Sequence, residues 1–125
     1  MTTIKSYTDL SQSKKLAEIL PLKSADMRYE AYYVSPKDGI IEYEKHPHFA
    51  KCIENCISCW SLDALLNLIP DSIYENTDDF AQLEITKRSV GYHDINDNIV
   101  IGTLAGNLVD ACVDMIVKLH EINLL

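Results

Sequence analysis

Residues 99–121 of the chain are IVIGTLAGNLVDACVDMIVKLHE, and they predict a strand followed directly by a helix. Residues 99–104 are mostly apolar and β-branched, a composition that strands favour. Asn107 is a residue type that caps helix N-termini, and the side chains after it repeat at helical spacing. The apolar side of this helix consists of Leu108, Val109, Cys112, Val113, Ile116 and Leu119, opposite Asp110, Asp114, Lys118 and Glu121. An amphipathic helix beside a strand predicts a core that both share.

Two β-hairpins are expected before this helix. Over residues 83–88, Leu83, Ile85 and Lys87 alternate with Glu84, Thr86 and Arg88, and residues 94–98 separate this run from residues 99–104. Earlier in the chain, residues 26–34 and 40–43 flank the turn-forming sequence SPKDG. Each pair of runs predicts two antiparallel strands.

Two shorter helices are predicted from their capping and stop signals. The first begins near Ser6, whose hydroxyl can cap it with Asp9 three residues on, and it ends before Pro21. The other covers residues 62–69, and Ser61 can cap it.

Residues 47–57 predict one more helix, because Pro47 suits a first helical turn and the apolar side chains after it lie on one arc. The complete prediction is an α+β fold, in which an antiparallel sheet from two β-hairpins packs against three to four helices, in the order α-ββ-αα-ββ-α. At 125 residues the chain suits one hydrophobic core, so a single globular domain over residues 1–125 is expected.

The composition excludes several classes of function. No apolar run approaches the roughly 18 residues that a membrane span needs, and the first residues lack the apolar core of a signal peptide, so a cytoplasmic protein without membrane contact is expected. The net charge of −8 opposes direct nucleic-acid binding, because phosphates are met by clustered Lys and Arg. A negative surface suits a basic protein partner, or it serves solubility alone.

The cysteines allow a metal site or a plain structural role. In a reducing cytoplasm, free thiols or a metal site are expected rather than disulfides. His48, Cys52 and Cys56 lie at four-residue spacing, and with a ligand from elsewhere they could hold zinc. Alternatively, the cysteines are small apolar side chains on the buried side of the predicted helix. No other cofactor is expected.

Two patterns could support catalysis. Cys59 could act as a nucleophile if the fold brings a base to it. His93 followed by Asp94 could act in acid–base chemistry, because a carboxylate can orient an imidazole. The alternative for this pair is a set of solvated polar side chains at a hairpin turn. The sequence favours a protein that is not an enzyme.

Tyrosines are concentrated in the first predicted hairpin. Tyrosine combines a large apolar area with a polar tip, and it is enriched where proteins meet partners. The tyrosines of this hairpin are therefore interface candidates, or else two face the core and two cover the sheet. They are Tyr29, Tyr32, Tyr33 and Tyr43.

Several stretches resemble a family of short uncharacterised proteins of gut bacteria, their phages and mobile elements. The resemblance implies an origin and a kinship of fold, and it carries over no activity and no site. The stretches are residues 7–21 (YTDLSQSKKLAEILP), 24–27 (SADM), 59–66 (CWSLDALL), 109–116 (VDACVDMI) and 118–121 (KLHE).

Together these features predict a non-enzymatic protein-binding or regulatory accessory protein of a phage or mobile element. We expect its partner to be a protein, including a second copy in a homodimer, with the tyrosine-rich hairpin or the acidic residues 71–79 as contact surface. A sharper version is an acidic inhibitor that occupies the basic groove of a host protein. The alternatives are a small enzyme that depends on Cys59 or His93, and a zinc-stabilised module.

Overall fold

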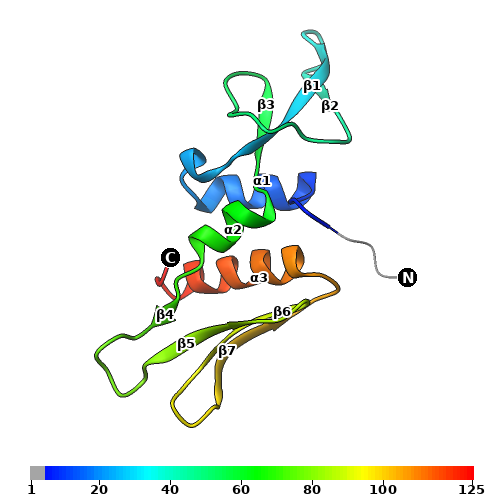
Figure 1. Cartoon of the computed structure of the whole chain (residues 1–125). Helices are drawn as coiled ribbons and strands as arrows, with labels where there is room; N and C mark the ends of the chain where they lie inside the picture. Colours follow the sequence, from blue (N-terminus) through cyan, green and yellow to red (C-terminus); the bar gives the residue numbers. More distant parts are fainter. Residues whose placement is uncertain (1–4) are drawn as a thin grey trace. The chain divides into compact units, whose positions relative to one another are not determined.

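The computed structural model describes residues 5–125, which divide into two compact units (Figure 1). The N-terminal unit comprises residues 7–64, and the C-terminal unit comprises residues 65–125 together with residues 5 and 6. Within residues 5–125 the chain forms three α-helices and two antiparallel sheets, so the predicted α+β class is confirmed. The single domain stays a prediction. None of the helices in this part of the chain combines the length and apolar character that crossing a membrane requires.

The N-terminal unit is built on a three-stranded sheet in the order β2-β1-β3. Its strands are β1 (Met27–Ser35), β2 (Ile40–Tyr43) and β3 (Cys56–Cys59). The hairpin of β1 and β2 confirms the prediction, and Gly39 supplies the positive φ of 67° that the turn requires. β1 pairs with β3 through its first half and with β2 through its second half. Each half of β1 therefore has one neighbouring strand, β3 for the first half and β2 for the second.

The helix predicted over residues 47–57 is wrong. Residues 44–55 contain no helix, and the chain then enters β3, which pairs with Met27 to Glu30 of β1. The apolar arc does not face a core, because Phe49 and Ile53 are 77% and 87% exposed. The run of apolar residues fits a strand as well as a helix, and pairing with β1 decides between them.

The first helix, α1 (Leu10–Ile19), begins later than Ser6. Its N-cap is Asp9, whose carboxylate accepts from the backbone N–H of Gln12 at 2.8 Å while the Gln12 side chain accepts from the backbone N–H of Asp9 at 3.1 Å. The helix ends before Pro21, as expected, and the single-turn 3-10 helix η1 (Leu22–Ser24) follows it.

Thr8 accepts hydrogen bonds that connect the segment before α1 to the rest of the N-terminal unit. The buried Tyr29 hydroxyl donates to the Thr8 carbonyl at 2.7 Å, and the Trp60 backbone N–H donates to the Thr8 hydroxyl at 3.2 Å. Trp60 is fully buried, and its indole N–H donates to the Ser24 hydroxyl. Burial raises the pKa of Tyr29 above its usual value, because the charged form loses its water. These polar groups are satisfied inside the core.

The C-terminal unit contains a four-stranded sheet in the order β4-β5-β6-β7. Its strands are β4 (Ser72–Ile73), β5 (Ala81–Ile85), β6 (Ser89–His93) and β7 (Ile99–Leu104). The prediction missed β6 as a strand and paired the wrong neighbours, since β6 lies between β5 and β7. The sequence SVGYH of β6 contains a glycine and gives only a weak strand pattern.

Two more helices match the sequence closely. The helix α2 (Leu62–Leu68) begins after Ser61, whose hydroxyl accepts from the backbone N–H of Ala64. The helix α3 (Leu108–Glu121) begins after Asn107, whose side chain accepts from the backbone N–H of Asp110 at 2.9 Å. The boundary between the two units lies within α2.

The helix α3 covers one face of the four-stranded sheet (Figure 1). Val90 and Tyr92 of β6 are fully buried, and the Thr103 hydroxyl donates to the Ala111 carbonyl of α3 at 2.8 Å. Because side chains alternate along a strand, Ser89, Gly91 and His93 lie on the opposite face. That face carries the groove described below.

Replacing Tyr29 with phenylalanine tests the core of the N-terminal unit. We expect Tyr29→Phe to lower the free energy of unfolding by about 1–2 kcal/mol, because the buried Thr8 carbonyl would keep only the weak Cys59 thiol as a donor. Chemical denaturation followed by the fluorescence of Trp60, the single tryptophan, measures this change. The control is Tyr33→Phe at a 52% exposed position, where we expect a change within about 0.5 kcal/mol. Equal losses in both variants would contradict the proposed role of the Tyr29 hydroxyl.

Candidate functional site

The zinc ligand set predicted from the sequence does not form in this structure. Cys52 and Cys56 are joined by a disulfide with a Cα–Cα distance of 5.8 Å, which corrects the expectation of free thiols. Sulfurs bonded to each other are not the thiolates that zinc requires. The third predicted ligand, His48, contacts a carboxylate instead, with 3.0 Å between its Nε2 and the Glu44 Oε2.

Two groups of side chains bring an imidazole together with two carboxylates. Their ligand atoms lie within 4.8 Å of one another in each group. Imidazole and carboxylate ligands suit zinc and other first-row transition metals. In the first group an arginine, Arg28, already pairs with one of the carboxylates. The groups are Glu30, Glu44 and His48 in the N-terminal unit, and Glu84, His93 and Asp97 in the C-terminal unit.

Cys59 is fully buried against the start of the chain. Its thiol lies 3.4 Å from the Thr8 hydroxyl, and burial raises the pKa of the thiol. A nucleophilic cysteine needs a lowered pKa and partial exposure. The structure therefore gives Cys59 the environment of a core side chain.

His93 and Asp94 do not act as a pair. The Asp94 carboxylate accepts from the backbone N–H groups of Asn98 and Asn96, both at 2.9 Å, and these hydrogen bonds lower its pKa. Asp94 thus stabilises the turn between β6 and β7. His93 lies instead between the carboxylates of Glu84 and Asp97, each 3.3 Å from a different ring nitrogen.

The sequence analysis missed both carboxylate partners of His93. Glu84 reaches His93 from the neighbouring strand β5, and that contact depends on a strand pairing that the pattern did not predict. Asp97 lies four residues after His93 and adopts a φ of 64°, which Asp tolerates better than most residues. The polar turn at residues 94–98 was the available signal for Asp97.

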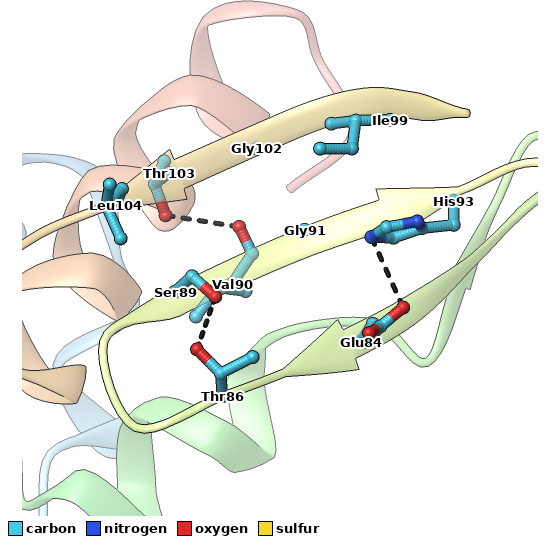
Figure 2. A pocket seen from close by; sticks show the side chains of 10 residues that line it. All are labelled: Glu84, Thr86, Ser89, Val90, Gly91, His93, Ile99, Gly102, Thr103 and Leu104. Atoms are coloured by element: carbon cyan, nitrogen blue, oxygen red, sulfur yellow. Dashed lines mark hydrogen bonds and ion pairs between the residues drawn. The ribbon is translucent and has the colours of Figure 1, made fainter. Parts of the chain in front are cut away.

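A groove lies on the sheet face opposite α3, with His93 at one end (Figure 2). Its volume is about 390 Å³. The floor is formed by Gly91 and Gly102, which are directly paired between β6 and β7. Neither glycine places a side chain in the groove, so backbone atoms form its floor, although Gly91 is buried and Gly102 is only partly exposed. The other lining residues are Glu84, Thr86, Ser89, Val90, His93, Ile99, Thr103 and Leu104.

The four tyrosines proposed as an interface separate into two pairs. Tyr29 is buried in the core, and the half-buried Tyr43 packs against that core with the Lys14 ammonium 5.9 Å from its ring centre. Tyr32 and Tyr33 are 64% and 52% exposed. The Tyr32 hydroxyl donates to the Glu42 carboxylate at 2.6 Å, which raises the pKa of Tyr32.

The exposed pair belongs to a larger group of exposed apolar side chains on the β1–β2 hairpin. Three aliphatic side chains complete the group, and each of the five is at least 39% exposed. The strand pairing places them on both faces of the hairpin, with Val34 opposite Ile41 on one face and Tyr33 opposite Glu42 on the other. We call this surface the hairpin patch, and it consists of Tyr32, Tyr33, Val34, Ile40 and Ile41. The hairpin carrying it projects away from α1 (Figure 1).

Comparison of the chain with models of protein families, with curated proteins and with solved structures finds no match. The resemblance to proteins of gut bacteria and phages, and the origin that it implies, therefore stay predictions. The site has to be interpreted from its own geometry.

The disulfide can be tested by counting thiols. We expect two reactive thiols, Cys59 and Cys112, in unfolded protein that has not been reduced, and four after reduction. In folded protein both should react slowly, because they are fully buried and burial raises the pKa of Cys112 to about 11. A chromogenic thiol reagent provides the count, and the double variant Cys52→Ser/Cys56→Ser should give two in either state. Four thiols without reduction would show that the Cys52–Cys56 bond is absent.

Proposed function

We propose that this chain is a non-enzymatic protein-binding protein that uses the hairpin patch as its contact surface. The observation that carries the proposal is the exposure of five neighbouring apolar side chains on one projecting hairpin. Single exposed apolar residues are common on protein surfaces, whereas contiguous groups mark sites of interaction. Burying such a surface contributes about 25 cal/mol for each Å² removed from water.

The backbone of the hairpin supports the same function. The strand β2 is at the edge of its sheet, so one side of its backbone is not paired with a strand among the described residues. Natural proteins usually protect such edges with lysine, proline or a covering element, and an apolar edge is a template for pairing. The sequence of β2 is IIEY, which contains no lysine or proline. Its one charged side chain, Glu42, accepts a hydrogen bond from the Tyr32 hydroxyl within the same hairpin.

The partner that best fits this edge is a second copy of the chain. In an antiparallel pairing that overlaps all of β2, Ile40 of one copy faces Tyr43 of the other, and Ile41 faces Glu42. No like charges meet in this register, and the same patch serves both copies, as a two-fold dimer requires.

The charge of the hairpin also favours contact between copies. Residues 27–43, which form the hairpin, carry two positive charges, at Arg28 and Lys37, and three negative charges, at Glu30, Asp38 and Glu42, so their net charge is −1. The whole chain has a net charge of −8, which opposes association through most other surfaces. The low net charge of the hairpin allows close approach at a smaller electrostatic cost.

A lysine in the patch tests this proposal. We expect the mass of the wild-type chain to rise from 14.2 kDa toward twice that value as the protein concentration increases. Ile41→Lys should weaken the dimer about ten-fold or more, because it brings a charge to the edge that the partner would cover. Sedimentation velocity over micromolar to near-millimolar concentrations measures both.

The matched control is Ile95→Lys. Ile95 is 87% exposed in the turn between β6 and β7, so this variant adds the same charge outside the patch. It should dimerise like the wild type. A wild-type protein that stays at 14.2 kDa throughout, or an Ile41→Lys variant that dimerises as tightly as Ile95→Lys, would overturn the proposal.

A further inference from the structure

We propose that the groove on the open face of the C-terminal unit binds the guanidinium group of an arginine side chain from a basic partner protein. This site is on a different sheet from the hairpin patch, and the inference does not depend on self-association. Two properties of the groove carry it. They are a floor of glycine backbone that has no side chain of its own and the negative charge at one end.

The floor of the groove is flat because two glycines are paired across β6 and β7. A Cβ at Gly102 would lie 3.1 Å from the Ile99 Cγ2, and a Cβ at Gly91 would lie 3.8 Å from the His93 Nε2. The Ile99 and His93 side chains therefore lie close against the two glycines and form the sides of the groove. The volume of about 390 Å³ is within the range of natural ligand sites, which are mainly apolar with a few polar groups.

The charge in the groove is concentrated near His93. The Glu84 carboxylate lines the groove and contacts the His93 Nε2, as Figure 2 shows. Asp97 lies at the other ring nitrogen and adds a second negative charge. Lys87 and Arg88 lie in the turn between β5 and β6, near the opposite end, where they would disfavour a cation. A cationic group is therefore expected at the His93 end.

A guanidinium fits this end better than a metal ion or an ammonium group. Its planar fork can bind a carboxylate through two hydrogen bonds, and its flat face can lie against the glycine backbone of the floor. A metal ion bound to one ring nitrogen would displace a carboxylate that already contacts that nitrogen, because Glu84 and Asp97 contact different nitrogens of His93. The Ile99 side chain can cover the alkyl part of an arginine.

The remaining polar groups of the groove can accommodate a peptide backbone. Thr86 and Ser89 line the end away from His93, and their hydroxyls lie 2.5 Å apart. Hydroxyl groups both donate and accept, so they can meet the N–H and C=O groups of a bound chain. The groove would then hold one arginine and the backbone beside it.

The test is a titration of the whole chain with N-acetyl-L-arginine amide, followed through the backbone amide signals of Gly91 and Gly102 by NMR. We expect both signals to shift in a saturable way, and the affinity to fall as salt is added. The matched ligand is N-acetyl-L-citrulline amide, which has nearly the same shape and no charge. It should bind at least about five-fold more weakly.

Two variants identify the groups responsible. Glu84→Gln should reduce the arginine affinity about five-fold. Asp97→Asn should reduce it about two-fold or less, because the Asp97 carboxylate contacts the other ring nitrogen of His93 and does not line the groove. Asp78→Asn removes one charge from an exposed loop outside the groove and should bind like the wild type. Each variant should keep the remaining amide spectrum, which confirms that it is folded.

The inference is overturned by any of three results. These are the absence of shifts at Gly91 and Gly102, equal binding of the citrulline and arginine ligands, and equal loss in Glu84→Gln and Asp78→Asn. These three results have the same interpretation whether or not the chain dimerises, because the hairpin patch contributes no residue to the groove.

Discussion

The hydrogen bond from the buried Tyr29 hydroxyl to the Thr8 carbonyl anchors the N-terminal unit. It fixes the first half of β1, which is also paired with β3, and it leaves the second half to continue beyond the core with β2 alone. A two-stranded ribbon has only marginal stability in water by itself. The anchored half of β1 therefore supports an exposed hairpin whose apolar side chains would otherwise have no fixed arrangement, and this supports a contact function.

The C-terminal unit follows a related constraint on a different sheet. The helix α3 supplies apolar cover for Val90 and Tyr92, so only one face of the sheet is buried by it. On the other face, the paired Gly91 and Gly102 form the floor of a groove between polar and apolar side chains. Both proposed binding surfaces thus lie on a part of a sheet that no other element of the same unit buries. The exposed side chains on that part determine which partner each surface can bind.

The sequence predicted the elements that have strong local signals. The Asn107 cap and the apolar side of α3 lie where expected, because capping and helical spacing are local properties. The prediction failed for residues 47–57 and for β6, because the strand pairing that decides their structure is not visible in the local pattern. The same cause explains why the sequence did not predict the contacts of the candidate site. The disulfide and the Glu84–His93 contact depend on how the chain brings residues together, which residue types alone do not reveal.

Amide hydrogen exchange of β2 (Ile40–Tyr43) at low and high protein concentration tests the central claim most directly, because it locates the contact as well as detecting it. If the edge of β2 pairs with a second copy, its outward-facing amides should become protected as the concentration rises, while amides of the turn at residues 94–98 should not change. Protection that is independent of concentration in β2, or that appears only elsewhere, would contradict the role of the hairpin.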